Sequence, residues 1–324
     1  MTMTQRKNFQ LLLDGKIPEF RPIYYELYKT CGLADSLVNH PKKNGPDAFG
    51  VEWVITPEGA ITKPGCILFD DIADWKQYVH FPDLSMYDFK AAAETDLAGT
   101  DRSDKVINVN FAVGLYQRMV AFMGFENTLC SLIEDPEACD EFFGEMADFN
   151  IRCIEKMIDA YKPDVVTYFD DFATSQSLFM SPQVYRKLIK PHQARILHSI
   201  SAKGVIVAEH LCGKCEEVLD DFVEMGVQIW SSAQVMNDIP FLEKKYKGRL
   251  IIEGGWDSFG PAGYPDATTE QILKEADRCL SEYGKEYNYI LFPIIVTPDP
   301  NDPRISALCE YWRKISGISS PGTR

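Results

Sequence analysis

The chain has no apolar run long enough to cross a bilayer and no N-terminal segment of the secretory kind. Residues 9–13 form too short a run for the apolar region of a signal peptide, and no other stretch approaches the length of a membrane span. The nine cysteines are scattered, and an odd number cannot all pair internally. We therefore expect a cytoplasmic protein with reduced thiols.

Basic residues are also scarce. Lysine and arginine total 33 against 48 aspartates and glutamates, so the formal net charge is −15. Nucleic acids and anionic membranes attract basic surfaces, so we expect neither as a main partner. A chain of 324 residues is near the upper limit for one domain and is typical of closed α/β barrels. We expect one barrel domain over residues 1–324, and the oligomeric state, including a homo-oligomer, stays open.

No Gly-x-Gly-x-x-Gly phosphate loop follows any expected strand, which disfavours an open nucleotide-binding sheet. Apolar runs predict strands at 21–25, 106–111, 165–169, 205–210, 227–230, 250–253 and 289–292. Helices are expected between them, among them 136–161 and 182–203, the second kinked at Pro191. Strand–helix alternation indicates parallel strands with crossover helices.

Two segments at the N-terminal end differ from this alternation. Residues 5–16 are expected to form a short amphipathic helix. Residues 47–80 contain two apolar runs around Pro57, Glu58 and Gly59, which is a hairpin signal. We interpret this segment as a β-hairpin insertion outside the main repeat.

Polar residues stand at the carboxyl ends of several expected strands, which is where barrel enzymes place their active sites. Side chains on a strand alternate between its faces, so residues two apart share one face. The pairs are Asn108 with Asn110, Tyr168 with Asp170, and Gln228 with Trp230, and Asp171 follows Asp170 directly. For Asp170 and Asp171, helix capping is the structural alternative.

The sequence His210-Leu211-Cys212-Gly213 ends the expected strand 205–210. His210 and Cys212 would project to one side, with imidazole and thiol adjacent. Soft sulfur beside imidazole suits zinc, although a buried inert cysteine is the alternative. We therefore predict a zinc site at His210 and Cys212.

The succession Asp170-Asp171, Ser181-Pro182, Tyr185-Arg186, Pro191 and His210-Leu211-Cys212-Gly213 resembles the uroporphyrinogen decarboxylase superfamily. The segments 47–53 and 254–257 resemble its catabolic branch. This resemblance covers about residues 20–315 and implies an α/β fold, a distorted (β/α)8 TIM barrel.

The decarboxylases of this superfamily carry an N-terminal Arg-x-x-Gln-Ala-Gly-Arg segment and a C-terminal Gly-His-Gly signal, and this chain has neither. The resemblance therefore favours the cobalamin-dependent methyltransferases, in which the His-x-Cys pair binds zinc. Their third ligand, usually a cysteine after the last strand, is replaced here by the isoleucine-rich segment 294–296. Candidate replacements are Glu253, Asp170, Cys215 and Cys309, and we predict Glu253.

The resemblance implies transfer of a methyl group from a small methylated substrate, such as an aryl methyl ether, to cobalamin carried by a partner corrinoid protein. Zinc would act as a Lewis acid on the ether oxygen. Predicted catalytic residues are Asp170 and Asn110, and predicted substrate-binding residues are Tyr24, Asn108, Tyr168, Trp230 and Trp256. Methylcobalamin:thiol methyltransfer, porphyrinogen decarboxylation and a non-catalytic binding barrel are the alternatives.

Overall fold

The protein is described from a computed structural model, which covers residues 3–32, 37, 41–56, 59–297, 299 and 301–318. Its chain divides into two compact units that are both discontinuous in sequence. The first comprises Met1–Lys29, Thr100–Val106 and Gln228–Arg324, and the second comprises Thr30–Gly99 and Ile107–Val227. Strand β1 (Tyr28–Gly32) passes from the first unit to the second.

The second unit is built on three parallel strands, β5 (Val106–Phe111), β6 (Val165–Phe169) and β7 (Ile206–His210). Their registers pair Asn110 with Thr167 and Phe169 with His210. All three strands lie where the apolar runs predict them. Because the strands are parallel, their carboxyl ends meet at one edge of the sheet.

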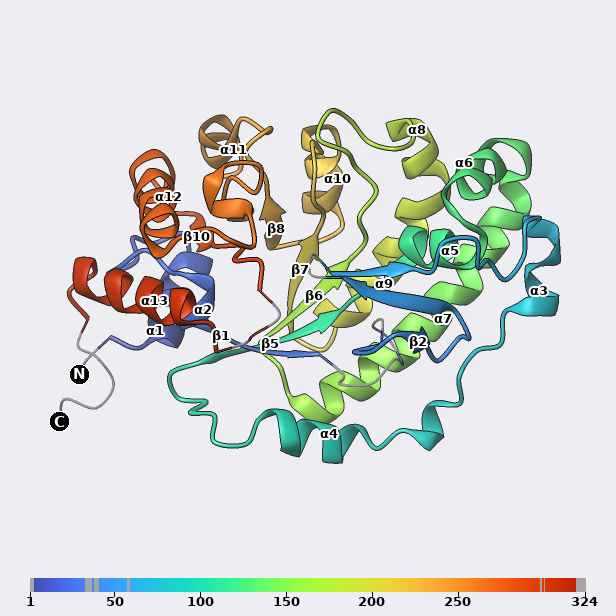
Figure 1. Ribbon diagram of the computed structural model, residues 1–324, viewed down its shortest axis with the longest axis horizontal. Helices are drawn as coiled ribbons and strands as arrows, with labels where there is room; N and C mark the ends of the chain where they lie inside the picture. The colour runs from blue at the N-terminus through green and yellow to red at the C-terminus, as the bar shows by residue number, and fades with distance from the viewer. Residues whose placement is uncertain are drawn as a thin grey trace. The chain divides into compact units, whose positions relative to one another are not determined.

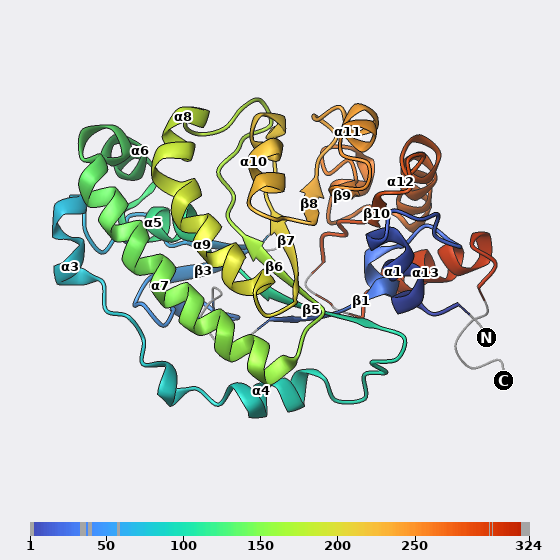
Figure 2. The ribbon, with the colours of Figure 1, turned by 180° about the vertical axis from the view of Figure 1, so that it is seen from behind.

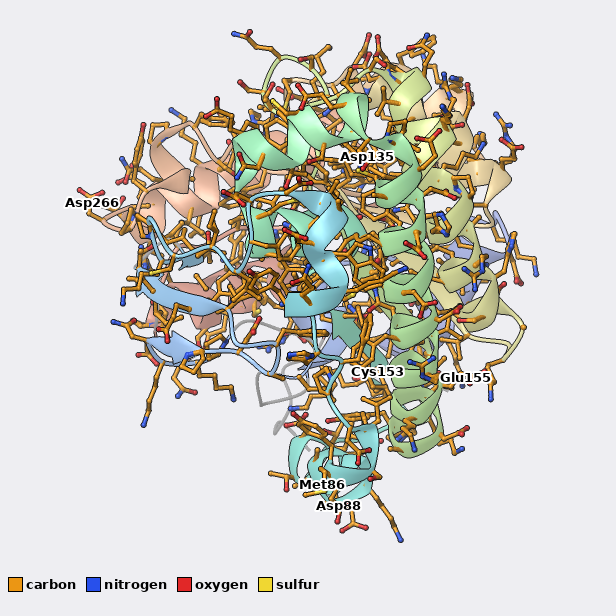
Figure 3. All side chains as sticks on the ribbon, turned by 90° about the vertical axis from the view of Figure 1, so that its right-hand side faces the viewer. Met86, Asp88, Asp135, Cys153, Glu155 and Asp266 are labelled. Atoms are coloured by element: carbon orange, nitrogen blue, oxygen red, sulfur yellow. The ribbon has the colours of Figure 1, made fainter. Side chains whose placement is uncertain are left out.

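Helices of the second unit cover this sheet, and the longest, α7 (Pro136–Tyr161), has the predicted bounds. Asp135 accepts a hydrogen bond from the Ala138 N–H, and Pro136 occupies the first turn, so the local sequence sets the start of the helix. Figure 3 shows α7 running from Asp135 past Cys153 and Glu155. The others are α3 (Trp75–Tyr78), α4 (Phe89–Asp96), α5 (Leu115–Met123), α6 (Phe125–Glu134), α8 (Pro182–Val184), α9 (Lys190–Ser201) and α10 (Leu219–Glu224), with 3-10 turns η1 (Ile72–Asp74), η2 (Leu84–Met86) and η4 (Glu216–Val218).

The predicted helix 182–203 is broken by one wide turn, η3 (Tyr185–Ile189), a π-helical segment between α8 and α9. Pro191 has no N–H to continue the regular ladder, and the Lys190 N–H bonds instead to the Tyr185 carbonyl five residues back. Beyond this turn α9 lies side by side with α7 (Figure 2).

The predicted hairpin is present as part of a three-stranded antiparallel sheet in the second unit. It comprises β2 (Gly45–Pro46), β3 (Glu52–Thr56) and β4 (Gly59–Thr62), with Trp53 opposite Thr62. Residues 57–58, at the predicted turn, lie outside the described residues. The sheet lies beside α5 (Figure 1).

The first unit contains three further parallel strands in the order β8 (Ile229–Ala233), β9 (Ile251–Gly255) and β10 (Tyr289–Phe292). These also lie at or within three residues of the predicted positions. The helices are α1 (Gln5–Leu13), α2 (Tyr24–Leu27), α11 (Ile239–Lys245), α12 (Thr269–Glu282) and α13 (Pro303–Ile315), with a 3-10 turn η5 (Pro261–Gly263).

The prediction of a strand at residues 21–25 is wrong. Only Ile23 makes a bridge, to Leu291, and the chain then turns into α2. The turn lets Tyr24 stack on Phe292 with ring centroids 4.2 Å apart, and it brings Glu26 to an ion pair with Arg313 at 2.6 Å. These tertiary contacts outweigh the local strand preference.

No helix in the described part of the chain combines the length and the apolar character that crossing a bilayer requires.

Candidate metal site

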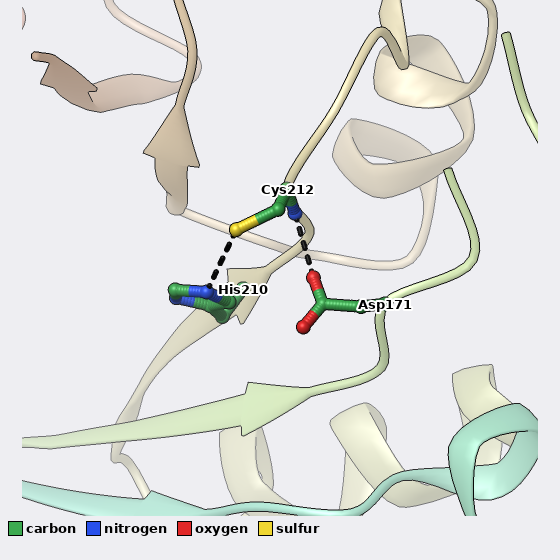
Figure 4. A group of neighbouring side chains, drawn as sticks. All are labelled: Asp171, His210 and Cys212. Atoms are coloured by element: carbon green, nitrogen blue, oxygen red, sulfur yellow. Dashed lines mark hydrogen bonds between the residues drawn. The ribbon is translucent and has the colours of Figure 1, made fainter. Parts of the chain in front are cut away.

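Three side chains that suit a metal ion converge in the second unit: Asp171, His210 and Cys212 (Figure 4). One ligand atom from each lies within 4.8 Å of the other two. His210 Nε2 is 3.3 Å from Cys212 Sγ, and the Cys212 N–H donates a 2.7 Å hydrogen bond to Asp171 Oδ1. No other such set of three occurs among the residues that the structure describes.

The strand ends explain this convergence. β7 ends at His210, and the chain extends to place Cys212 on the same face. β6 ends at Phe169, which is level with His210, so Asp171 follows on that face of the neighbouring strand. The Phe169 and His210 rings stack with centroids 4.1 Å apart and planes 18° from parallel.

Gly213 allows the turn that follows the pair. Its φ is +92°, and a Cβ here would lie 2.5 Å from the Thr174 carbonyl oxygen. The next residue, Lys214, donates its N–H to that carbonyl at 2.7 Å. The loop after β6 is thereby tied to the loop after β7.

The electrostatics favour the metal-binding form of His210. Burial lowers the pKa of His210, partly offset by the nearby Asp171 carboxylate. The imidazole is therefore mainly neutral near pH 7, which is the form that binds a metal. Gln117 Nε2 donates a 3.2 Å hydrogen bond to Asp171 Oδ2, which orients the carboxylate.

These residues fit a zinc ion. In a tetrahedral site, Zn–S and Zn–N bond lengths place a sulfur and a nitrogen ligand about 3.6 Å apart, close to the 3.3 Å between Cys212 and His210. A set of one nitrogen, one sulfur and one oxygen leaves the fourth position open. Three protein ligands with an open position are typical of catalytic rather than structural zinc.

A cavity of about 560 Å³ has Asp171 in its wall. Its size is that of small-molecule sites in proteins. The lining is largely apolar and aromatic: Trp53, Ala60, Ile61, Thr62, Ala112, Val113, Tyr116, Gln117, Val120, Ala121, Phe125, Phe169, Asp171, Ala173 and Phe179. None of these described lining residues carries a positive charge.

Comparison with known families shows which family the chain belongs to. The family model described as uroporphyrinogen decarboxylase (URO-D) matches residues 45–293. The chain belongs to the uroporphyrinogen decarboxylase family. The matched residues include Asp171, His210 and Cys212 and the strands β2, β3 and β4.

Among solved structures, a methyltransferase from Methanosarcina mazei superposes with a TM-score of 0.68 at 14% identity, covering 97% of this chain and 99% of that one. This likeness confirms the α/β barrel fold expected for a uroporphyrinogen decarboxylase family member. An endo-β-mannanase/endo-β-glucanase from Prevotella bryantii has a TM-score of 0.35 at 10% identity, over 91% of this chain and 49% of that one, which is too low to support an argument. No curated protein matches the sequence.

Asp170, predicted as catalytic, lies next to the site in sequence but on the opposite face. Its two oxygens accept hydrogen bonds from the Tyr116 N–H at 3.1 Å and the Gln117 N–H at 3.0 Å, at the start of α5. Burial raises the pKa of this carboxyl to about 7. Gly114 must be glycine here, since a Cβ would lie 2.6 Å from the Asp170 side chain. The geometry thus fits the capping alternative, and the catalytic role stays a prediction.

Tyr168, predicted to bind substrate, shares the face of Asp170. The Asn150 side chain on α7 donates a 3.4 Å hydrogen bond to the Tyr168 hydroxyl, so the ring points toward the helix layer. Asn108 and Asn110 lie on the same sheet face as His210, because their partners on β6 precede Phe169 by even steps. Asn108 accepts a hydrogen bond from Thr167, while Asn110 Oδ1 is buried with no hydrogen-bond partner among the described residues.

The remaining predicted residues, Tyr24, Trp230, Glu253 and Trp256, belong to the first unit. Trp230 and Trp256 are fully buried there. The Glu253 carboxyl accepts hydrogen bonds from Ser231 and Tyr28, and burial raises its pKa to about 7. Their roles as substrate-binding residues and as a zinc ligand stay predictions.

Sequence reasoning placed Asp171 beside the site without assigning it to the metal. Cys215, one of the alternatives considered, is buried, and burial raises the pKa of its thiol well above the ordinary value. The signal that would have found Asp171 is the strand register. With Phe169 level with His210, residue 171 and not residue 170 shares the face of His210 and Cys212.

Proposed function

We propose that this protein is a methyltransferase that moves a methyl group from a small methylated substrate, an aryl methyl ether, to the cobalt of a corrinoid on a partner protein. The carrying observation is the convergence of Asp171, His210 and Cys212 beside a largely apolar cavity. Three protein ligands would leave the fourth position of a tetrahedral metal open. The methyltransferase title of the Methanosarcina mazei structure supports the reaction class. We place the reaction in the cytoplasm.

Asp171, His210 and Cys212 would hold zinc, which when bound supplies a Lewis acid to stabilise the negative charge that develops on the leaving oxygen. Gln117 holds the Asp171 carboxylate in place through its 3.2 Å hydrogen bond. The Phe169 ring fixes the plane of the His210 imidazole by stacking on it. The apolar wall displaces water from the side of the substrate that it covers, which strengthens electrostatic interactions on that side.

The ligand set favours an ether over a thiol as the substrate. Asp171 supplies a hard carboxylate oxygen where a thiol-methylating site would carry a second cysteine. A thiolate-poor sphere leaves the metal better suited to an oxygen substrate than to a soft sulfur one. Thiol methylation from methylcobalamin is the second candidate.

Porphyrinogen decarboxylation receives less support from the cavity. A substrate with several carboxylates requires guanidinium or ammonium partners. The described residues that line the cavity offer only the negatively charged Asp171 and no cation. A bound zinc with an open position would favour this proposal over a non-catalytic binding barrel.

Metal analysis of the purified protein tests the metal half of the proposal. We expect about one zinc per chain in the wild type, and loss of that zinc in His210→Ala. His198→Ala is the matched control, because His198 is exposed in the last turn of α9. Equal zinc contents in both variants, or a metal-free wild type under zinc-replete conditions, would contradict the proposed site.

Methyl transfer itself is tested by incubating the zinc-loaded protein with a reduced corrinoid protein and methoxylated aromatics. Methylation of cobalt changes the visible spectrum of the corrinoid, so formation of the methylated form can be followed directly. We expect methylation with aryl methyl ethers and none with His210→Ala. If no ether methylates the corrinoid while a methylated corrinoid transfers its methyl group to a thiol, the second candidate replaces the first.

A further inference from the structure

We propose that the β2–β4 sheet is the substrate-selecting wall of the cavity, and that Trp53 makes the cavity specific for a flat, fused aromatic ring. This inference rests on the proposed function for the role of the bound molecule as a substrate. The walls come from two sources. Trp53 on β3 and Ala60, Ile61 and Thr62 on β4 form one side, and α5 and α6 form the other.

Trp53 is held rigidly in this wall. Its indole N–H donates a 3.1 Å hydrogen bond to Asp47 Oδ2, and the side chain is buried. Asp47 also accepts the N–H groups of Phe49 at 2.9 Å and Val51 at 3.0 Å, and it pairs with Arg118 Nη1 on α5 at 2.5 Å. One buried carboxylate therefore joins the sheet to the helix on the other side of the cavity.

The opposite wall is also aromatic. The Tyr116 and Phe179 rings are stacked, with centroids 6.0 Å apart and planes 25° from parallel. Phe125 meets Phe179 edge-on at 4.9 Å. Aromatic walls of this kind favour a flat ring over a puckered one, because stacked and edge-on ring contacts add to apolar burial.

The rim of the cavity is apolar and open to solvent. Ile61 is 49% exposed and Phe125 is 46% exposed, from opposite sides of the cavity. Apolar side chains gathered around a cavity mouth mark a surface that a ligand covers. A molecule larger than one ring would reach this rim and bury both side chains.

Val113, between β5 and α5, adds a second sign of function. This β-branched residue has a φ of +69° and lines the cavity. A left-handed conformation is unfavourable for a β-branched residue, and such strain is concentrated at binding and catalytic sites.

The single charged group of the described lining defines the orientation of the ligand. Asp171 is also the residue shared with the candidate metal site. A ligand with an apolar, planar body and one oxygen facing a zinc ion held by Asp171, His210 and Cys212 would fit this lining. An ether of a fused aromatic ring has this chemistry.

The test measures binding of 2-methoxynaphthalene and of methoxycyclohexane to the zinc-loaded protein by calorimetry, without corrinoid protein. We expect 2-methoxynaphthalene to bind about tenfold more tightly than its saturated, puckered counterpart. Trp53→Ala removes the wall and Ile61→Trp fills the cavity, and each should weaken binding of the aromatic ether about tenfold.

One control separates the wall from the fold. Ile55→Ala truncates an exposed β3 residue that does not line the cavity. It should bind the aromatic ether within about threefold of the wild type. Should Trp53→Ala fail to fold, Ile61→Trp decides the question, because its substitution lies at the exposed rim.

Binding and transfer can fail separately. If no ether methylates a corrinoid but 2-methoxynaphthalene binds and loses affinity in Ile61→Trp, the aromatic pocket stands and the proposed function falls. If methyl transfer proceeds but Trp53→Ala and Ile61→Trp bind the aromatic ether as the wild type does, the pocket inference is overturned. Equal affinity for both ethers would also overturn it.

Discussion

The ion pair of Asp47 and Arg118 offers a sharp test of how the hairpin sheet is held. The Arg118 side chain is 2% exposed and that of Asp47 is fully buried, and their atoms are 2.5 Å apart. Asp47→Asn leaves the guanidinium buried without a counter-ion. Loss of one partner from a buried pair costs about 3–5 kcal/mol.

Aromatic faces reduce this cost. The Arg118 guanidinium lies 4.6 Å from the ring centre of Phe49 and 5.6 Å from that of Phe122. Each such contact is worth about 0.5–1 kcal/mol at an exposed site and about 2 kcal/mol where water is excluded. We therefore expect Asp47→Asn to lower the free energy of unfolding by about 3 kcal/mol.

The reverse substitution should cost less. In Arg118→Met the Asp47 carboxylate keeps three donors, the N–H groups of Phe49 and Val51 and the indole of Trp53. Hydrogen bonds to a charged group contribute about 1.5–3 kcal/mol each, and these three remain in the variant. We therefore expect Arg118→Met to lower the free energy of unfolding by about 2 kcal/mol.

The double variant Asp47→Asn/Arg118→Met removes both charges together. Its cost should be about 2 kcal/mol, well below the sum of the single costs, because neither charge is left buried alone. Urea unfolding followed by circular dichroism measures all three variants. If Asp47→Asn cost less than about 1 kcal/mol, as for an exposed ion pair, or if the two single costs simply added, this account of the buried pair would be refuted.

Three further predictions concern the two units. Asp171→Asn should weaken zinc binding about a hundredfold in a competition titration with a chelating dye. The control Asp159→Asn, at an exposed position on α7, should bind zinc as the wild type does. Equal zinc affinities of the two variants would exclude Asp171 as a ligand. Burial raises the pKa of Glu253 to about 7. The folded protein therefore keeps a proton that the unfolded chain releases above about pH 4. The free energy of unfolding of the wild type consequently falls as the pH rises from about 4 to about 7. Between about pH 5 and pH 8, the free energy of unfolding measured with urea should therefore fall by about 2 kcal/mol less for Glu253→Gln than for the wild type. Parallel pH profiles of the two proteins would contradict the shift. The zinc content of Glu253→Gln tests the predicted ligand role. Gly213→Ala places a Cβ 2.5 Å from a carbonyl oxygen, whereas the Cβ of Gly204→Ala meets nothing within 4 Å. Gly213→Ala should therefore unfold at a clearly lower urea concentration than Gly204→Ala. Identical unfolding midpoints would contradict the close contact.

Local sequence determined much of the secondary structure. Helix α7 begins after the Asp135 cap and Pro136, and these signals act within one turn of the helix. Strand β10 coincides with its apolar run, because buried parallel strands are continuous apolar segments. The His210 and Cys212 pair was visible because residues two apart on a strand share a face.

The choice between Asp170 and Asp171 was decided by tertiary structure. Both carboxylates follow one strand, and the alternation of faces alone cannot tell which of them joins a residue on another strand. The register of β6 against β7 sets Phe169 level with His210, which turns Asp171 to the metal site and Asp170 to the start of α5.

Residues 21–25 and the hairpin sheet show the same limit. By itself the sequence indicated paired strands within 47–80, and it favoured a strand at 21–25 that the structure does not have. Only tertiary contacts decided that Tyr24 stacks on Phe292 in a helical turn, and that Asp47 reaches Arg118 and fixes Trp53 over the cavity. Asp47 and Arg118 are 71 residues apart in the chain, and Tyr24 and Phe292 are further apart still. No local pattern encodes these two contacts, which depend on the packing of the whole unit.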